Sequence, residues 1–170
     1  MMTAPPGYDP SSFPPFAVTA DIAVFTVRGG RLLVALVERA HDPFRGAWAL
    51  PGGFVDEDED LDAAATRELS EETGLELAAT DISQLGVYGA PDRDPRMRVV
   101  SVVYWALVPG LPDPIGASDA ADARLLEVTE TLASPDMLAF DHHRILGDAR
   151  RHVEAAPGVG RALRRSRADR

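Results

Sequence analysis

One stretch of the chain decides the fold, and it reads GFVDEDEDLDAAATRELSEETGL over residues 53–75. Asp60 can cap a helix that begins at Leu61. Gly74 can end that helix after about Thr73. Apolar residues recur along one side of the segment at helical spacing, which predicts a single buried stripe. The sequence therefore predicts an amphipathic helix near the middle of the chain.

Three carboxylates share one face of this expected helix. Glu68, Glu71 and Glu72 stand at i, i+3 and i+4, so the second and third lie about 300° and 400° around the axis from the first. Arg67 is the base next to them, and one base cannot neutralise three acids. A solvated surface is one explanation for such a face. The other is a hard divalent cation, which prefers several oxygen ligands, and the spacing alone favours neither.

The turn before the helix bears on that choice. Residues 51–54 read Pro-Gly-Gly-Phe, and the first three, 51–53, predict a sharp break in the chain. Because glycine permits close backbone approach, carbonyl groups of this turn could reach a cation held by the helix. On its own, the Gly-Gly pair would be an ordinary turn.

The negative charge of the chain is concentrated in this same region. The net charge is −10, and residues 56–76 hold ten acids and a single base. Such a concentration repels a bare phosphate ester or a nucleic acid unless cations intervene. All 17 basic residues are arginine, which fits either forked phosphate contacts or a genomic codon bias, and the codon bias is the favoured explanation.

Length and composition exclude several classes of protein. The 170 residues suit one domain with a proper core. The absence of cysteine excludes a disulfide framework, a zinc–thiolate site, an iron–sulfur cluster and a cysteine nucleophile. No apolar run approaches the ~20 residues of a membrane helix, and the first residues lack a secretory signal pattern. We therefore expect a cytoplasmic protein without membrane contact.

Strand and helix signals alternate on both sides of the central helix. Gly29 and Gly30 predict a hairpin turn, and the nearly continuous apolar run at 99–107 predicts a central strand. The expected strands are 18–27, 32–37, 84–88, 99–107 and 123–128, and Asp141 can cap a last helix through about Val153. Mixed strands with two helices predict an α/β fold whose sheet is covered on both faces.

The two ends of the chain differ in composition from the middle. Residues 1–16 contain five prolines and are expected to form a flexible Pro-rich arm. Residues 157–170 form a basic C-terminal tail with five arginines. For this tail, a solvated end is favoured over a nucleic-acid contact.

Taken together, these residues resemble the Nudix box. Its seven fixed positions are occupied by Gly53, Glu59, Arg67, Glu68, Glu71, Glu72 and Gly74, and its aliphatic positions by Leu69 and Leu75. The resemblance implies a Nudix α/β/α sandwich over residues 17–156, with a mixed central sheet, a catalytic helix after the Gly-Gly loop and a C-terminal helix.

The same resemblance implies a hydrolase that acts on a nucleoside diphosphate linked to another moiety and depends on Mg²⁺ or Mn²⁺. The residues at the positions of the metal ligands are Glu68, Glu71, Glu72 and, through its carbonyl, Gly53. Glu59 and Arg67 match residues that hold the loop against the helix, and Glu59 could also reach a metal through water. Glu71 matches the group that orients or deprotonates the attacking water, although in this family the base often lies in a loop.

Residues 93–101 and 138–142 resemble a narrower group, the ADP-ribose pyrophosphatase-like Nudix proteins. They imply cleavage of ADP-ribose or a related nucleotide sugar to AMP and a sugar phosphate. Both stretches also resemble the Nudix domain of repressors of NAD biosynthesis, which bind ADP-ribose and carry a winged-helix domain after it. Only about 15 residues follow the last expected helix, too few for that domain, so we expect no nucleic-acid partner. The family resemblance alone implies a homodimer.

Two other functions stay open from the sequence. One is a non-catalytic sensor of an ADP-ribose-type ligand, and the other is a pyrophosphatase that removes oxidised nucleoside triphosphates. The complete box favours an enzyme over a sensor.

Four further side-chain types invite a functional interpretation. Arg93 and Arg96 are candidates for binding substrate phosphate or ribose, because a forked guanidinium suits phosphate. Local ion pairs with the neighbouring aspartates 92 and 94 are an equally good explanation. For the remaining candidates, capping or packing is favoured over catalysis or stacking on adenine; they are His142, His143, Trp48 and Tyr88.

Overall fold

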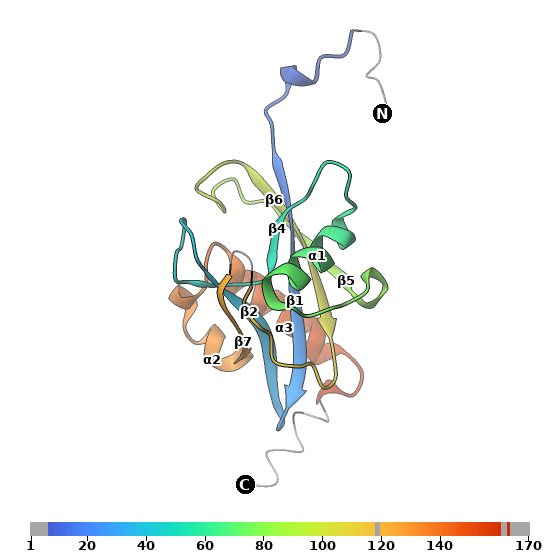
Figure 1. Ribbon diagram of the computed structural model, residues 1–170, viewed down its shortest axis with the longest axis vertical. Coiled ribbons are helices and arrows are strands. Elements are labelled where there is room, and N and C mark those ends of the chain that lie inside the picture. The colour runs from blue at the N-terminus through green and yellow to red at the C-terminus, as the bar shows by residue number, and fades with distance from the viewer. Residues whose placement is uncertain (1–6, 118–119, 161–162, 164–170) are drawn as a thin grey trace.

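A mixed seven-stranded sheet forms the centre of the molecule in the computed structural model, which describes residues 7–117, 120–160 and 163 (Figure 1). The strands are β1 (Ala17–Arg28), β2 (Arg31–Arg39), β3 (Trp48–Ala49), β4 (Gly52–Phe54), β5 (Ser83–Tyr88), β6 (Val99–Leu107) and β7 (Ala120–Glu127). The main path of the sheet is β3-β2-β1-β6-β5, with β4 paired to β1 and β7 paired to β2. Strands β1 and β6 are parallel, and the other pairs are antiparallel.

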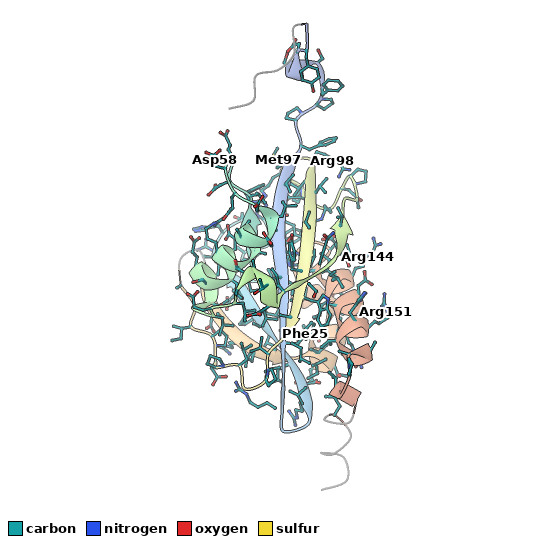
Figure 2. The ribbon with its side chains drawn as sticks, turned by 90° about the vertical axis from the view of Figure 1, so that its right-hand side faces the viewer. Phe25, Asp58, Met97, Arg98, Arg144 and Arg151 are labelled. Atoms are coloured by element: carbon teal, nitrogen blue, oxygen red, sulfur yellow. The ribbon has the colours of Figure 1, made fainter. Side chains whose placement is uncertain are left out.

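Helices cover both faces of this sheet. The α-helices are α1 (Leu61–Thr73), α2 (Val128–Leu132) and α3 (His142–Ala155), and short 3-10 turns lie at Pro10–Ser12, Ala79–Asp81 and Pro135–Met137. In Figure 2, α1 lies on one side of the strands and α3 on the other. This arrangement confirms the predicted α/β/α sandwich. No helix in the described ranges is long and apolar enough to cross a lipid bilayer.

Strand β1 separates two hydrophobic clusters, because side chains alternate between the two faces of a strand. Phe25 packs on the α3 side with Ile145. Ile22 packs on the α1 side with Leu69. All four side chains are fully buried. Since both faces of β1 are covered, the residues Thr19–Thr26 are buried without interruption, which explains the nearly continuous apolar sequence of this strand.

The predicted strands all form, with ends that differ by a few residues from the expected ones. The first hairpin turns at Gly29 and Gly30, and β6 lies between β1 and β5 as predicted for a central strand. The sharp break predicted at residues 51–53 is present as a bend at Pro51, but the two glycines after it are extended. Gly52–Phe54 forms β4, which pairs with β1 so that Gly52 lies opposite Asp21.

The helices begin and end near the predicted residues, but the side chains predicted to cap them do not do so. Helix α1 starts after Asp60 and ends before Gly74, whose φ of 66° is the left-handed conformation expected at this position. The predicted capping by Asp60 and Asp141 is wrong, since neither side chain makes a capping hydrogen bond. The Asp141 carboxylate instead accepts two hydrogen bonds from Arg93. Helix α2 was not predicted, because five residues are too few to show a periodic pattern.

The N-terminal arm is described from residue 7 onward. In Figure 1 it leaves the sheet at the start of β1 and extends away from it. Its aromatic side chains Tyr8, Phe13 and Phe16 are exposed. Residues 1–6 of the expected arm and most of the basic tail, 161–162 and 164–170, lie outside the described residues.

Candidate active site

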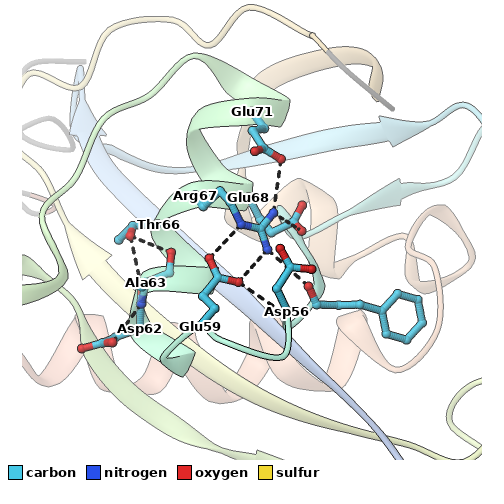
Figure 3. A network of polar contacts seen from close by, with 9 residues as sticks. Asp56, Glu59, Asp62, Ala63, Thr66, Arg67, Glu68 and Glu71 are labelled. Atoms are coloured by element: carbon cyan, nitrogen blue, oxygen red, sulfur yellow. Dashed lines mark hydrogen bonds and ion pairs between the residues drawn. The ribbon is translucent and has the colours of Figure 1, made fainter. Parts of the chain in front are cut away.

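Arg67 is the centre of a polar network that joins α1 to the loop before it (Figure 3). Its guanidinium donates to both carboxylate oxygens of Glu59, at 2.8 Å from Nε and 2.9 Å from Nη2. Nη1 donates to Glu68 at 2.7 Å and to Glu71 at 3.2 Å. Nη2 also reaches the Phe54 carbonyl at 3.3 Å. One arginine therefore contacts three carboxylates and the end of β4.

The carboxyls around Arg67 have opposite pKa shifts. The hydrogen bonds from Arg67 hold the pKa of Glu59 below its ordinary value. Burial raises the pKa of Glu68, and the bond from Arg67 offsets this effect only in part. A buried carboxylate whose charge is incompletely neutralised favours the approach of a further cation. The network around Arg67 therefore holds one carboxyl whose ionisation is favoured, that of Glu59, and one whose ionisation is disfavoured, that of Glu68.

The Gly-Gly pair lies in direct contact with α1 on one side and β1 on the other. The Gly52 N–H donates to the Glu72 carboxylate at 3.1 Å. A Cβ on Gly52 would stand 2.6 Å from a carbonyl oxygen of β1 and would also overlap the Asp21 carboxylate. A Cβ on Gly53 would overlap the carboxylate of Glu68. Close approach of β1 backbone therefore requires glycine at position 52, whereas a side chain at position 53 would displace the Glu68 carboxylate.

Asp21 is a residue of this region that the sequence analysis missed. Its side chain is buried on β1, with 6% of its surface exposed. It accepts a short hydrogen bond from the Ser101 hydroxyl and a longer one, at 3.4 Å, from Thr19. The available signal was a single acid inside an otherwise apolar strand, since a charged residue is rarely buried without a role.

The donor set of α1 fits a hard divalent cation in its chemistry. Three carboxylates belong to one helix, and the Glu68 carboxylate lies so close to Gly53 that a Cβ there would overlap it. Glu68 and Glu71 bond to Arg67, and Glu72 bonds to the Gly52 amide. In the described part of the chain, no three acidic or histidine side chains are already gathered around one point.

A pocket of about 440 Å³ opens beside these carboxylates. Its acidic wall includes Glu68, Glu72 and Asp21. Four arginines also line it, namely Arg39, Arg67, Arg93 and Arg96, together with the aromatic rings of Phe54 and Phe140. Arg39 was missed by the sequence analysis because nothing near it in the chain marks it as different from other surface arginines.

The two arginines singled out from the sequence both line the pocket but already bind aspartates. Arg93 is buried and forks onto Asp141, at 2.8 Å from Nη2 and 3.2 Å from Nε. Arg93 therefore pairs with Asp141, where the local alternative had predicted an ion pair between Arg93 and Asp92. Arg96 forks onto Asp94, at 2.7 Å from Nη2 and 3.0 Å from Nε, as the local alternative predicted. Each fork uses Nε and Nη2.

The histidines and aromatic residues have structural contacts. His142 is buried, and its Nδ1 accepts the Leu50 N–H at 3.0 Å. Burial lowers the pKa of His142, which favours the neutral ring that this hydrogen bond needs. The Tyr88 hydroxyl donates to Asp148 at 2.9 Å. Trp48 packs at the edge of the α3-side cluster. These contacts agree with packing and not with capping, and His142 also lines the pocket.

Three known proteins illustrate what the chain is similar to. It is 38% identical to the ADPR responsive transcriptional repressor NtrR of Acinetobacter baylyi over 84% of this chain and 56% of the repressor. It is 41% identical to the ADP-ribose pyrophosphatase of Methanocaldococcus jannaschii over 68% of this chain and 64% of that protein. The NUDIX domain of Shewanella oneidensis NrtR, solved in complex with ADP ribose, superposes with a TM-score of 0.77 at 36% identity, over 86% of this chain and 94% of that domain.

The chain thus spans somewhat more than half the length of the two curated relatives. The family model for the NUDIX domain matches residues 15–148, which run from the start of β1 into α3. That range includes the whole sheet, helix α1 with its glutamates, and the Gly-Gly pair that packs against them. With the fold, the box and the family model in agreement, the chain belongs to the Nudix family.

Proposed function

We propose that this protein is a metal-dependent pyrophosphohydrolase that cleaves ADP-ribose, or a related nucleotide sugar, to AMP and a sugar phosphate. The observation that carries the proposal is the acidic face of α1, which lies beside a pocket whose other lining includes arginines. A carboxylate wall suits cations, and arginines suit the phosphates of a nucleotide. The similarity to an ADP-ribose pyrophosphatase and to an ADP-ribose-bound NUDIX domain supports this choice of substrate.

Mg²⁺ or Mn²⁺ would be held by Glu68, Glu71, Glu72 and the Gly53 carbonyl, which supply oxygen ligands from one helix and the adjoining strand. When bound, the cation would screen the charge of the diphosphate and promote attack of water on phosphorus. The raised pKa of Glu68, which reflects burial, supports a role as ligand, because a cation would relieve the cost of ionising that carboxyl.

The residues around the cation have distinct tasks in this proposal. Arg67 and Glu59 hold the loop in place by the forked pair at 2.8 and 2.9 Å. Glu71 has half of its side-chain surface exposed, so its carboxylate is open to solvent water and can orient it or take up its proton. The water oxygen bonds to one phosphorus, the bridging P–O bond breaks, and the departing phosphate leaves on the other product.

Arg93 and Arg96 remain proposed contacts for substrate phosphate or ribose. Both use Nε and Nη2 for their aspartates, so Nη1 is the donor that a ligand would meet. Because Arg93 is buried and Arg96 is partly exposed, we expect the larger effect on binding from Arg96.

A second candidate function is an ADP-ribose-responsive regulator. It is favoured by the 38% identity to a transcriptional repressor, although the chain covers only 56% of that protein. Such a regulator would bind ADP-ribose without consuming it.

Several expectations from the sequence remain predictions. For partners and location, these are the absence of a nucleic-acid partner, a homodimer and a cytoplasmic location. For domain organisation, they are the flexible arm at 1–16, the Nudix domain at 17–156 and the basic tail at 157–170.

One experiment separates these possibilities. A panel of nucleoside diphosphate compounds and oxidised nucleoside triphosphates is incubated with the protein and either Mg²⁺ or Mn²⁺, and the products are separated by chromatography. The proposal predicts AMP and a sugar phosphate from ADP-ribose. Pyrophosphate from a triphosphate would identify a sanitising enzyme instead, and tight binding of intact ADP-ribose would identify a sensor.

A further inference from the structure

Two buried polar side chains line the pocket beside the α1 glutamates, and neither has a task in the proposed function. Asp21 stands on β1 with 6% of its surface exposed, and His142 stands at the start of α3 with 3% exposed. Buried polar side chains normally have their hydrogen-bonding atoms paired. Each of these two pairs one atom with the protein and has another atom for which the described residues provide no partner.

Asp21 presents a hydrogen-bond acceptor to the pocket. Both side-chain hydrogen bonds that its carboxylate receives within the described residues end on Oδ2, from the Ser101 hydroxyl and, at 3.4 Å, from the Thr19 hydroxyl. Because Ser101 and Thr19 are themselves buried, these bonds fix the orientation of the carboxylate. Oδ1 lies against Gly52, and a Cβ there would overlap it. A side chain at position 52 would therefore cover or displace Oδ1, and glycine does neither.

His142 presents a hydrogen-bond donor to the same pocket. Its Nδ1 accepts the Leu50 N–H at 3.0 Å, so the hydrogen of the neutral ring lies on Nε2. Burial lowers the pKa of His142 and thereby keeps the ring neutral. No residue in the described ranges accepts a hydrogen bond from Nε2. Of the acids that act on the pKa of His142, Asp21 has the largest effect, which indicates that the two side chains are close neighbours.

An acceptor and a donor that line one pocket limit the chemical groups that fit between them. A phosphate oxygen would meet the Asp21 carboxylate as a like charge. The amino group of a base can donate to Asp21 but is a poor acceptor for the His142 N–H. A hydroxyl satisfies both residues, because its O–H donates and its lone pairs accept. Water can do the same in the free protein, and a sugar hydroxyl that replaces this water keeps both hydrogen bonds.

We propose that Asp21 and His142 form a hydroxyl-binding pair, in which Asp21 Oδ1 accepts a hydrogen bond from a ribose hydroxyl of the substrate and His142 Nε2 donates one to the same oxygen. The inference rests on the proposed function for the presence of a ribose beside the diphosphate. Asp21 packs on Gly52, whose N–H bonds to Glu72, so the pair lies next to the acidic face of α1. The two residues would therefore select substrates by the sugar attached to the diphosphate.

Two nearly isosteric variants remove the two hydrogen bonds one at a time. Asp21→Asn retains an oxygen for the Ser101 and Thr19 hydroxyls and places an amide NH₂ where Oδ1 stands, so the acceptor becomes a donor. His142→Asn retains an acceptor for the Leu50 N–H and has no atom at the position of Nε2. We expect each variant to raise the KM for ADP-ribose by about 10-fold, while kcat changes by less than about 3-fold.

His143→Asn is the matched control for the second variant. His143 is the next residue on α3, its Nε2 bonds to the Leu132 carbonyl at 3.0 Å, and it is not among the residues that line the pocket. It should leave the KM unchanged within about 2-fold. Thermal melting checks that all three variants fold, and if His142→Asn does not, the Asp21→Asn comparison decides.

Two analogues of ADP-ribose test the hydrogen bonds directly and identify which ribose is bound. One analogue lacks the 2′ and 3′ hydroxyls of the adenosine ribose, and the other carries a methyl ester in place of the terminal ribose. For the unaltered protein, one of them should have a KM about 10- to 100-fold above that of ADP-ribose, because it leaves two buried groups unpaired. For Asp21→Asn, the same change of substrate should cost less than about 3-fold, since the bond is already lost.

Penalties of equal size in the unaltered protein and in Asp21→Asn, for both analogues, would overturn the proposal, and so would an unchanged KM in both variants. Calorimetric titration with ADP-ribose and the two analogues gives the same comparison without turnover. A protein that binds ADP-ribose but does not cleave it would contradict the proposed enzyme and would still test the hydroxyl-binding pair. Absence of any binding of ADP-ribose would overturn both.

Discussion

Glu71 and Glu72 are neighbours in the sequence but have different partners. Glu71 bonds to Arg67 at 3.2 Å, and Glu72 accepts the Gly52 amide at 3.1 Å. We expect Glu71→Gln and Glu72→Gln each to reduce turnover of ADP-ribose by about 100-fold or more, because each would remove a charge next to the proposed cation. The melting temperature should change by less than about 4 °C, since neither side chain belongs to the core. Kinetics and thermal melting check both statements.

Glu57→Gln is the control for these two variants, since Glu57 is exposed in the same acidic stretch. It should leave turnover unchanged within about 2-fold. Near-normal activity of both Glu71→Gln and Glu72→Gln would remove the proposed mechanism.

The two glycines of β4 give a contrasting pair of variants. Gly52→Ala should lower the free energy of unfolding by about 1–3 kcal/mol, because its methyl group meets backbone of β1 that cannot move freely. Gly53→Ala should cost less stability but more activity, since its methyl group meets the end of the Glu68 side chain, which can swing aside. Urea denaturation and turnover measure the two effects. A larger loss of stability for Gly53→Ala would contradict the packing described here.

Single residues also show how far the sequence alone could go. The arc of Glu68, Glu71 and Glu72 follows from spacing, because residues three and four apart share a helix face. The fork between Arg93 and Asp141 does not, since 48 positions separate the two and only the finished fold brings them together. Arg39 and Phe140, which are also in contact, lie still further apart in the sequence, and no local pattern predicts that contact.

At the scale of elements, the start of α3 is fixed by His142. Its buried ring accepts the Leu50 N–H, which ties the helix to the chain just before β4. Burial holds the pKa of His142 below its ordinary value, so the folded state resists protonation while the unfolded state takes up a proton below about pH 6.5. The contribution to stability is therefore present above that pH and is lost as the pH falls.

As the pH falls below about 6.5, the free energy of unfolding should decrease by up to about 1.4 kcal/mol per pH unit because of the one proton that His142 takes up on unfolding. His142→Asn, which keeps a neutral hydrogen-bond acceptor, should be less stable at neutral pH but should show a shallower decline. Chemical denaturation of both proteins at about pH 7.5 and about pH 5.5 gives the comparison. Equal declines in the two proteins would show that His142 does not titrate on unfolding.

Elements differed in how well the sequence predicted them. The long strands and α1 carry their own periodic or apolar patterns, and all of them form near the expected ends. Strand β4 was mistaken for a turn, because two glycines normally signal a turn and the partner strand that stabilises them lies about 30 residues earlier. The capping by Asp60 and Asp141 failed because side-chain rotamers are set by tertiary neighbours that the sequence does not reveal.

The whole molecule is a sheet between two cores, and β1 contributes to both. We expect the two cores to unfold together. Leu69→Ala, on the α1 side, should lower the free energy of unfolding by about 2–5 kcal/mol. Trp48 and Trp105 pack on the α3 side, so their fluorescence reports on the opposite core. Fluorescence and circular dichroism should shift by the same amount in this variant; separate transitions would contradict a single cooperative unit.

The most direct test of the central claim is phosphorus NMR of ADP-ribose incubated with the protein and Mg²⁺. The account predicts that the diphosphate signals are replaced by two monophosphate signals, those of AMP and a sugar phosphate. It also predicts that removal of the metal by a chelator stops the change and that Glu72→Gln slows it by about 100-fold. Diphosphate signals that persist with Mg²⁺ and with Mn²⁺, under conditions where ADP-ribose binds, would contradict the account and leave a ligand sensor in its place.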